Sequence, residues 1–409
     1  MVVVGGGVAG LSAAIEAAPA GRVVLLEADP EHLGGSAWWG QAATAVPTAA
    51  QWPGDAPARA RYRDRVTPDV IAWTEALGLR WLDLPSAALP LKAPVGGGRR
   101  LADLLWRVAE QQGVEVHLGT TVTDITPRLT VEAGTASWSA DAVILATGGW
   151  AADLPGVRTA LGLTESQPLL NGALPSATGA AFSLAGDLGA ARHTPPGVVL
   201  YGHGTPDPEQ PERALVMLGA ERAFIVDTQG TPQPWLRDVR GETGARLLGL
   251  PGGTAWAILD GQTLRTLRLQ GSGVERHVPA RVAAAKTGHV ADSLDALAAK
   301  ISLPPEALRA GLATAGVTAA APLLASGPYA ALPLVPMTAK STSGLRTDEG
   351  GQVLDEAGAP IPGLYAAGEA AGFGHPYDGD AVLDSTMVAG AILTGRLAGA
   401  AVRQSLAAE

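Results

Sequence analysis

The amino-acid sequence predicts an α/β fold in which a parallel sheet carries a β-meander and is interrupted by an inserted α+β segment. Two observations lead to this prediction. Short apolar runs near the N-terminus alternate with a helical run, which is the pattern of β-α-β units. A middle stretch, rich in proline at first, separates these runs from similar ones near the C-terminus.

A strand, a glycine-rich turn and a helix open the chain as Met1–Val4, Gly5–Gly10 and Leu11–Ala18. The turn has the spacing G-x-G-x-x-G, and its residues predicted to bind a phosphate-bearing cofactor are Gly5, Gly7, Val8, Ala9 and Gly10. Gly5 permits a tight turn, Gly7 lets a pyrophosphate approach the backbone, and Gly10 lets strand and helix pack closely. The free N–H groups and the positive dipole end of the helix then favour phosphate.

The second strand, Arg22–Leu26, ends in Glu27, which lies 17 residues beyond Gly10. An acidic residue at this place suits a hydrogen bond to a ribose hydroxyl and would repel a 2′-phosphate. The other interpretation is an ordinary surface glutamate after a buried strand. Because the glycines and the β-turn-α-β order occur together, the sequence predicts a Rossmann-like domain that binds a dinucleotide.

Composition limits the class of protein. The 409 residues suffice for two domains with a large core. The net charge of −10, without a basic tract, argues against nucleic acid as a partner. Cysteine is absent, which excludes disulfides, thiol redox chemistry and Cys-ligated clusters within this chain. No apolar run is long enough to span a membrane, and the first strand starts at Met1, so we expect no signal peptide and a cytoplasmic location.

The remaining elements follow in order. Gly34-Gly35-Ser36 is predicted to place backbone N–H groups against a second phosphate or a ribityl chain. Further strands and helices are expected at Val114–Leu118, Thr120–Ile125, Asp141–Leu145, Ala177–Gly189, Ser293–Lys300, Pro305–Leu312, Gly344–Asp348, Gly363–Glu369 and Val388–Gln404. The predicted domains are 1–195 with 332–409, which form the discontinuous dinucleotide-binding domain, and 196–331, which forms an inserted domain.

Several motifs occur in an order that resembles one family. Met1–Gly10 with Glu27, Ala146–Gly149, and Ile361–Glu369 are similar to the FAD-binding flavoproteins that include fumarate reductase, succinate dehydrogenase, L-aspartate oxidase and 3-ketosteroid dehydrogenases. Ser343–Asp348 resembles the ketosteroid dehydrogenase branch. The segments that resemble bacterial FAD-binding dehydrogenases and the end of the family's capping domain are Ala370–Gly374, Thr394–Gly399 and Ala291–Ala298. The resemblance implies an FAD-binding domain and a capping domain at 196–331.

The resemblance implies FAD as the cofactor. Only one dinucleotide turn is present, so we expect no nicotinamide in a second Rossmann domain. No histidine lies in Ser36–Val46, where some relatives attach FAD covalently, so noncovalent binding is expected; Trp38 and Trp39 there either flank the flavin or pack in the core. The other residues predicted to bind FAD are Ala28, Gly34, Gly35, Ser36, Gln41, Ala42, Val122, Ala146, Thr147, Gly148, Gly368, Glu369, Asp384, Ser385, Thr386 and Val388. Val122 fits the adenine side. Asp384, Ser385 and Thr386 begin the last helix, where they either face the flavin pyrimidine edge or simply cap the helix.

Three residues are candidates for catalysis. His375, six residues past Glu369, has the spacing of the family's substrate-binding histidine. Arg240 falls at the family's proton-donor arginine, although a solvated arginine is the plainer interpretation. Tyr377 resembles the tyrosine of ketosteroid dehydrogenases that donates to a ketone oxygen, and otherwise is a packing residue. Gly379 stands where relatives carry a second carboxylate-binding arginine, which counts against a dicarboxylate such as fumarate. No metal site is indicated.

The expected function is that of an FAD-dependent oxidoreductase, a dehydrogenase or reductase, acting on a C–C bond adjacent to a carbonyl of a small-molecule substrate. Its electron donor or acceptor is not indicated. Hinges near Pro195 and Leu332 would admit the substrate and then exclude water. Three alternatives stay open: a flavin oxidase of an amine or amino acid, a catalytically degenerate FAD-binding protein, and a NAD-dependent dehydrogenase.

Overall fold

The computed structural model describes residues 1–53, 57–84, 90–218, 223–237, 243–271, 274–276, 287–316, 324–377, 383 and 385–408. The chain divides into two compact units. The first unit comprises Met1–Asp153, Ser176–Val198 and Lys340–Glu409, and the second comprises Leu154–Pro175 and Val199–Ala339. Each unit is described by itself. In the described ranges, no helix combines the length and the apolar character needed to cross a bilayer.

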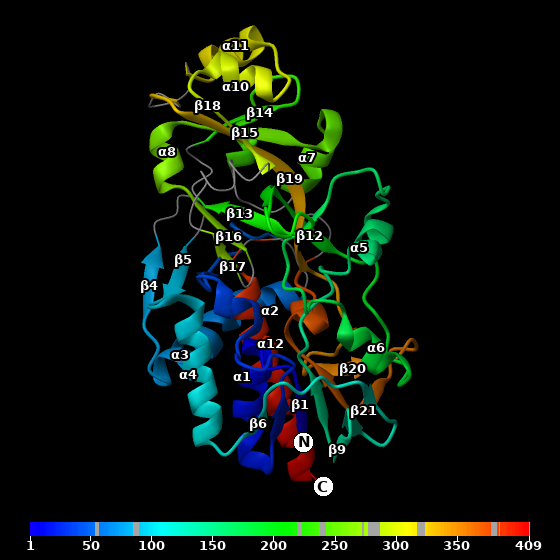
Figure 1. Cartoon of the computed structure of the whole chain (residues 1–409). Helices are drawn as coiled ribbons and strands as arrows, with labels where there is room; N and C mark the ends of the chain where they lie inside the picture. Colours follow the sequence, from blue (N-terminus) through cyan, green and yellow to red (C-terminus); the bar gives the residue numbers. More distant parts are fainter. Residues whose placement is uncertain are drawn as a thin grey trace. The chain divides into compact units, whose positions relative to one another are not determined.

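A six-stranded sheet, in the order β20-β21-β10-β1-β2-β6, forms the centre of the first unit as far as it is described (Figure 1). Its strands are β1 (Val2–Val4), β2 (Val24–Leu26), β6 (Glu115–His117), β10 (Val143–Leu145), β20 (Gln352–Leu354) and β21 (Pro360–Ala366). All neighbours pair in parallel except β20, which is antiparallel to β21. β1, β2 and β10 are buried along their whole length, as expected for parallel strands covered on both faces.

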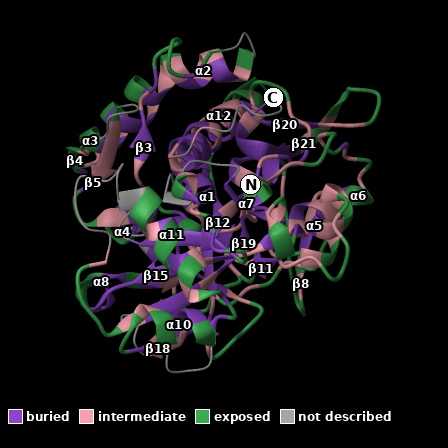
Figure 2. Cartoon of the chain, turned by 90° about the horizontal axis from the view of Figure 1, so that it is seen from above, coloured by how far each residue is buried: buried purple, intermediate pink, exposed green. Residues whose placement is uncertain are grey.

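Helices α1 (Val8–Ala17) and α12 (Met387–Ala408) run side by side against this sheet (Figure 1). Nine of the ten residues of α1 and ten of the 22 residues of α12 are buried, and purple marks these parts of both helices in Figure 2. The other helical segments of this unit are η1 (Ala18–Ala20), η2 (Gly35–Trp39), α2 (Pro57–Val66), η3 (Thr67–Ala72), α3 (Trp73–Ala76), α4 (Gly97–Gln111), α6 (Ala180–Gly186) and η8 (Gly368–Gly374). Alanine and glycine on the facing sides of α1 and α12 allow this close approach.

Two small antiparallel sheets complete the first unit. One has the order β3-β5-β4, and the other the order β7-β8-β9. Their strands are β3 (Thr44–Ala45), β4 (Trp81–Leu84), β5 (Leu91–Pro94), β7 (Asp124–Ile125), β8 (Thr130–Ala133) and β9 (Ala136–Ser139). The second of these sheets is the predicted β-meander, so the α/β class with a parallel sheet and a meander is confirmed.

The second unit is built on a mostly antiparallel sheet with the strand path β14-β15-β19-β12-β13-β16-β17, to which β11 and β18 add by pairing with β19. Its strands are β11 (Leu170–Asn171), β12 (Val198–Pro206), β13 (Ala214–Leu218), β14 (Phe224–Asp227), β15 (Ala255–Leu259), β16 (Arg268–Gly271), β17 (Val274–Arg276), β18 (His289–Ala291) and β19 (Tyr329–Ser341). Its helices are α5 (Leu154–Leu161), η5 (Pro234–Arg237), α7 (Thr243–Leu248), η6 (Pro251–Gly253), α8 (Gly261–Thr266), α10 (Leu294–Lys300) and α11 (Pro305–Gly316). Leucine, methionine and alanine from β13, β15 and β19 form one apolar core.

The division into units differs from the expected domain boundaries mainly in one segment, and at the two junctions residues 196–198 group with the first unit and residues 332–339 with the second. Leu154–Pro175, expected in the dinucleotide-binding domain, groups with the second unit. The physical reason is a two-residue parallel pairing of β11 with β19, Leu170 beside Met337, which is too short to recognise in a sequence. The expected strand Gly344–Asp348 is reduced to isolated bridges at Leu345 and Thr347. The roles of the units as FAD-binding and capping domains stay predictions.

Candidate functional site

The glycine-rich turn connects β1 to α1 with the geometry that its spacing suggests. Gly5 has φ +102°, and a Cβ there would lie 2.4 Å from the carbonyl oxygen of Ala146. A Cβ on Gly10 would lie 1.9 Å from the carbonyl oxygen of Gly5, so strand and helix pack directly on each other. At Gly7 a Cβ would meet no atom within 4 Å. The backbone at Gly7 is therefore open, beside the N-terminus of α1, where a phosphate can approach.

Glu27 turns its carboxylate back toward this turn. Its Oε2 accepts a hydrogen bond from the Gly6 N–H at 2.6 Å, and its Oε1 accepts one from the Asp29 N–H at 2.8 Å. Burial raises the pKa of the carboxyl above its usual value, and these backbone hydrogen bonds partly counteract that rise. An ionised carboxylate has about four acceptor sites, and the backbone N–H groups of Gly6, Asp29 and Ala28 do not use all of them, so acceptor capacity remains for a ribose hydroxyl.

A second glycine-rich segment lies directly beside the first. The Gly34 N–H donates to the carbonyl oxygen of Gly6 at 2.7 Å, and Gly34 forms a parallel bridge with Gly7. Gly34 and Gly35 both have positive φ, which places this backbone in a conformation that favours glycine. Ser36, which follows them, is exposed. The structure thus brings two predicted phosphate-facing segments together.

Trp38 packs between two side chains of the same unit. The His32 ring centroid is 4.8 Å from the Trp38 ring, and the Arg99 guanidinium carbon is 4.9 Å from its centroid. The indole Nε1 is buried without a hydrogen-bond partner. Nearby, Gln41 is exposed, and Ala42 is buried with φ +52°. The contacts of Trp38 agree with the packing interpretation, and its indole N–H is one of the unsatisfied donors of this segment.

The segment after β10 is the third segment at this end of the sheet. Together with the glycine-rich turn Gly5–Gly10 and the segment Gly34–Ser36 it forms what we call the cradle. Among the described residues, Thr147 Oγ1 is buried without a partner, and Gly148, at φ +80°, has open space where a Cβ would be. A Cβ on Gly149 would lie 2.1 Å from Glu369 Oε1. That carboxylate accepts hydrogen bonds from the Ser341 N–H at 2.7 Å and its hydroxyl at 3.0 Å, and burial raises its pKa. Glu369 therefore joins η8 to the sheet edge at Gly149.

The remaining predicted residues lie around the same unit. The Gly368 N–H donates to Thr394 Oγ1 at 2.9 Å, and Val122 packs on the core beneath the sheet. Ala28 is exposed, and Val388 lies in the first turn of α12. Ser385 has φ +63°, and its carbonyl oxygen accepts from the Ala45 N–H at 2.7 Å. Asp384 and Arg240 lie outside the described residues.

These observations test the fit of a dinucleotide to this chain. Open backbone at Gly7 and Gly148, the spare acceptor sites of Glu27, and the unpartnered buried hydroxyl groups of Thr44 and Thr147 are what a phosphate- and hydroxyl-bearing ligand would satisfy. The segments come together because the carboxyl ends of β1, β2, β10 and β21 meet at one edge of a parallel sheet. The residues present fit the group.

His375 faces into its own unit. Its Nε2 lies 3.1 Å from the carbonyl oxygen of Leu345, so Nε2 carries the proton and donates. The ring stacks on His193 with centroids 4.2 Å apart, and Nδ1 is buried with no partner in the part of the chain that the structure describes, 3.0 Å from the place where Gly372 would carry a Cβ. Burial, with smaller effects of His193 and Arg346, lowers the pKa of His375 to about 4. The imidazole is therefore neutral and acceptor-only at Nδ1.

Tyr377 is 6% exposed, and its hydroxyl is 2.6 Å from Thr386 Oγ1. Thr386 donates its own proton to the carbonyl oxygen of Leu383, so the phenol donates to Thr386. The Tyr377 ring packs against Trp52 and Phe373, with centroids 5.8 and 6.0 Å away. Donation to a ketone oxygen would require the bond to Thr386 to break. The roles of His375 and Tyr377 toward substrate stay predictions.

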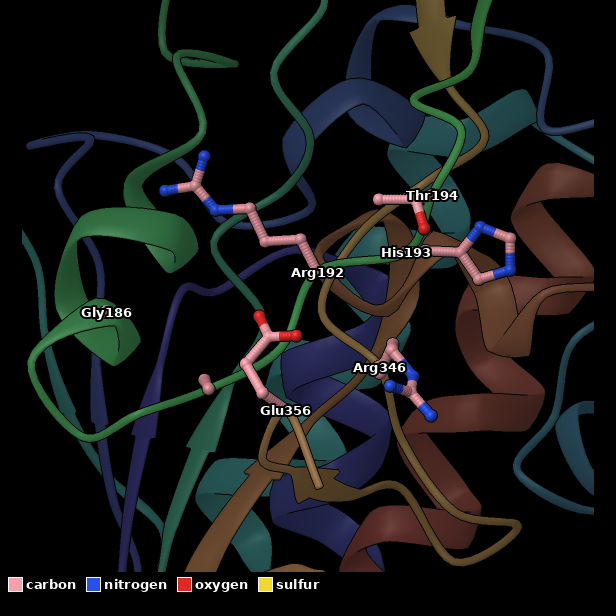
Figure 3. Close-up of a pocket in the computed structure, with 7 residues that line it drawn as sticks. Gly186, Arg192, His193, Thr194, Arg346 and Glu356 are labelled. Carbon is pink, nitrogen blue, oxygen red and sulfur yellow. The ribbon is translucent and has the colours of Figure 1, made fainter. Parts of the chain in front are cut away.

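A surface hollow of about 680 Å³ lies beside His193 (Figure 3). Arg192, Thr194, Arg346 and Glu356 also line it. The two guanidinium groups point in different directions in Figure 3, and that of Arg192 lies over the Phe182 ring at 4.3 Å. Because the charged side chains do not point to one place, this hollow has no position where several of them could bind an anion together. None of its lining residues was predicted to bind FAD or substrate.

One candidate that the sequence analysis passed over lies in the second unit. His203 is 4% exposed and its Nδ1 has no partner among the described residues. Thr205, two residues along β12 on the same face, is fully buried, and its hydroxyl also lacks a partner there. The Tyr201 ring lies on that face as well, 5.1 Å from the imidazole. Burial lowers the pKa of His203 to about 4. Polar residues alternating with apolar ones in a buried strand are the signal that could have revealed this row.

Comparisons with known proteins add to this geometry. A family model described as "FAD binding domain" matches residues 1–381. A KsdD-like steroid dehydrogenase of Mycobacterium tuberculosis is 44% identical over 78 residues, which cover 18% of this chain and 13% of that relative's length. A probable fumarate reductase of Shewanella frigidimarina is 26% identical across 98% of this chain and 74% of the relative.

The fold was also compared with solved structures. The 3-ketosteroid Δ1-dehydrogenase of Sterolibacterium denitrificans, in complex with 1,4-androstadiene-3,17-dione, superposes with a TM-score of 0.76. The superposition covers 99% of both chains at 18% sequence identity. At this identity the likeness concerns the fold.

Proposed function

Because the chain belongs to the FAD binding domain family, we propose that it is an FAD-dependent oxidoreductase acting on a C–C bond adjacent to a carbonyl group. The family match confirms FAD as the cofactor and confirms the resemblance stated from the sequence motifs. The observation that carries the proposal is this match over residues 1–381, which includes the cradle described above. The NAD-dependent alternative is thereby set aside.

In this proposal the residues of the first unit hold and orient the cofactor. The N–H groups at Gly7 and the start of α1 bind the pyrophosphate, and Glu27 accepts from the ribose. Thr147 and the Gly34–Ser36 segment contact the chain between phosphate and flavin, and the start of α12 stabilises negative charge on the ring. FAD, when bound, supplies the acceptor or donor of a hydride. No covalent link is proposed.

We propose a ketone rather than a dicarboxylate as substrate. Burial lowers the pKa of His375, which has the spacing of the family's substrate-binding histidine, to about 4, so at neutral pH it offers no positive charge to a carboxylate. A neutral carbonyl needs a hydrogen-bond donor instead, which the Tyr377 hydroxyl would supply by turning from Thr386 to the substrate. The steroid dehydrogenases among the relatives, and the ketosteroid dehydrogenase that shares the fold along 99% of both chains, support a 3-ketosteroid or a similar cyclic enone.

The test is anaerobic reduction of the bound flavin. We expect purified protein to be yellow and to bleach with a saturated or Δ4 3-ketosteroid such as 4-androstene-3,17-dione, with phenazine methosulfate restoring the colour. Succinate should leave the spectrum unchanged. Bleaching by succinate alone would overturn the ketone proposal. Bleaching by amines with hydrogen peroxide release in air would favour the oxidase, and no bleaching by any of these would favour a degenerate FAD-binding protein.

A further inference from the structure

Arg59 is a buried cation in the first unit. It lies on α2 with 5% of its surface exposed, on the same inward face as Tyr62 and Val66. Within the described ranges no carboxylate lies within ion-pair distance of its guanidinium. An inward position of a helix is normally filled by an apolar side chain, because a buried charge is costly unless polar groups compensate it. The compensating groups therefore indicate what this arginine does.

Those groups are two main-chain carbonyls, one just ahead of α2 and one from a distant part of the chain. Nε of Arg59 donates to the carbonyl oxygen of Pro376 at 3.2 Å, and Nη1 donates to the carbonyl oxygen of Pro53. The guanidinium carbon also lies 5.3 Å from the centroid of the Trp52 ring. A planar guanidinium offers several N–H donors in a fixed fork, so one side chain can hold two carbonyls at once. Neither an aliphatic residue nor a lysine can reproduce this arrangement.

The segment that Arg59 holds has an unusual backbone. Gly372, Phe373 and His375 all have φ between +53° and +58°, and two of them are not glycine. Such conformations persist only where surrounding contacts enforce them. Here the contacts are the Leu345 carbonyl on His375, the Arg59 donor on Pro376, and the Thr386 hydroxyl on Tyr377.

The inward face of α2 also reaches the start of α12. Trp52, against which Arg59 lies, packs on Tyr62 and Tyr377, with ring centroids 5.5 and 5.8 Å away. The Tyr62 hydroxyl donates to the carbonyl oxygen of Ala45 at 3.1 Å, and the Ala45 N–H donates to that of Ser385. α2 is thus tied to residues 376 and 385, on both sides of the segment that leads into α12.

We propose that Arg59 is a positioning residue, which fixes the His375–Tyr377 segment and the start of α12 through the Pro376 carbonyl and the Trp52–Tyr377 ring contact. The flavin-facing role of α12 rests on the proposed function, whereas the fixing of the segment does not. Arg59 touches neither substrate nor FAD in this proposal. Its loss would loosen the groups that meet them and leave the glycine-rich cradle intact.

Hydrogen–deuterium exchange of the FAD-loaded protein tests the fixing directly. In Arg59→Met we expect amides in 372–377 and 385–390 to exchange at least about tenfold faster, because local opening becomes easier. Arg61→Met is the matched control: it removes the same charge from the same helix, but Arg61 pairs with the exposed Glu349. Equal exchange in Arg59→Met and wild type would overturn the proposal, and so would equal acceleration in both variants.

A second readout separates positioning from general destabilisation. In Arg59→Met, a steroid that bleaches the wild-type flavin should do so about tenfold more slowly, with the half-saturating concentration changed less than about twofold. Added methylguanidinium should restore slow exchange in Arg59→Ala, and failure to restore it would count against the guanidinium. If Arg59→Met does not fold, Arg59→Lys carries the exchange test, because an ammonium lacks the planar fork that aims separate N–H groups at the two carbonyls. If the wild type bleaches with no substrate, the proposed function fails while the exchange result still decides on Arg59.

Discussion

At the scale of single residues, Glu27 shows how one side chain can serve both fold and ligand. Its carboxylate is held by the N–H groups of Gly6 and Asp29, and this fixes its orientation before any ligand arrives. A Cβ on Gly6 would lie 2.2 Å from Leu33 and 3.0 Å from the carboxylate, so the glycine and the acid depend on each other. The carboxylate is thus preorganised for a ribose.

Replacing Glu27 should therefore weaken FAD binding. Hydrogen bonds to a charged group contribute about 1.5–3 kcal/mol, so Glu27→Gln should raise the dissociation constant of FAD about tenfold or more. Glu27→Arg should have a larger effect because it also reverses the charge. The measurement is fluorescence titration of apoprotein with FAD. Asp29→Asn, a neighbour on the same loop, serves as control, and equal affinity in Glu27→Gln and wild type would remove the ribose role.

His375 and Tyr377 are the residues on which the predicted catalysis can be tested. His375→Ala and Tyr377→Phe should lower the rate of flavin bleaching by a steroid, yet leave the protein yellow. Tyr377→Phe also removes the hydrogen bond to Thr386, at a cost of about 1 kcal/mol in unfolding free energy. Normal bleaching rates in both variants, at wild-type flavin content, would exclude them from the substrate site.

At the scale of elements, the packing of α1 on α12 determines where the phosphate-binding end of α1 lies. A Cβ on Gly395 would lie 2.2 Å from the carbonyl oxygen of Ala9, and one on Gly399 would lie 2.4 Å from that of Ala13. The two helices therefore approach backbone to backbone. α12 therefore supports α1 and the glycine-rich turn at the start of α1, although the two helices lie at opposite ends of the sequence.

A single methyl group should disturb this contact. Gly395→Ala should lower the unfolding free energy by about 1–3 kcal/mol, as overpacked cores do, and should weaken FAD retention because α1 shifts. Gly186→Ala in α6 is the control: a Cβ there meets nothing within 4 Å, so it should be neutral or slightly stabilising. Thermal denaturation monitored by flavin fluorescence measures both. A wild-type melting temperature for Gly395→Ala would contradict the close packing.

At the scale of the whole molecule, two buried histidines predict a loss of stability in acid. Folding lowers the pKa of His203 and His375 from 6.5 to about 4, so between these values the unfolded chain binds more protons. Stability is therefore fully present above pH 6.5 and falls as the pH drops toward 4. Each histidine contributes up to about 3 kcal/mol by linkage.

Urea denaturation at a series of pH values measures this dependence. His203→Gln and His375→Gln should each flatten the decline on the acid side, and the double variant should flatten it further. His117→Gln is the control, because its ring is half-exposed and lies against Glu115. An unchanged pH profile in the double variant would show that these histidines do not carry the acid sensitivity.

Local signals in the chain were enough to predict the α/β class, the parallel strands, the meander and a dinucleotide cofactor, because each depends on short-range spacing: glycines in a turn, apolar runs, and an acid at a strand end. The resemblance of several motifs to one family then implied FAD. These local signals did not predict which distant segments contact one another. The two-residue pairing of β11 with β19 groups Leu154–Pro175 with the second unit. The Tyr377 hydroxyl forms a hydrogen bond with Thr386, nine residues away. The inward turn of His375 and the carbonyls that surround Arg59 likewise come from segments far apart in the chain. Sequence patterning therefore determined which elements form and which cofactor they suit. Only tertiary packing decided which polar atoms are left free to meet a substrate, because burial and hydrogen bonding depend on neighbours brought together by folding.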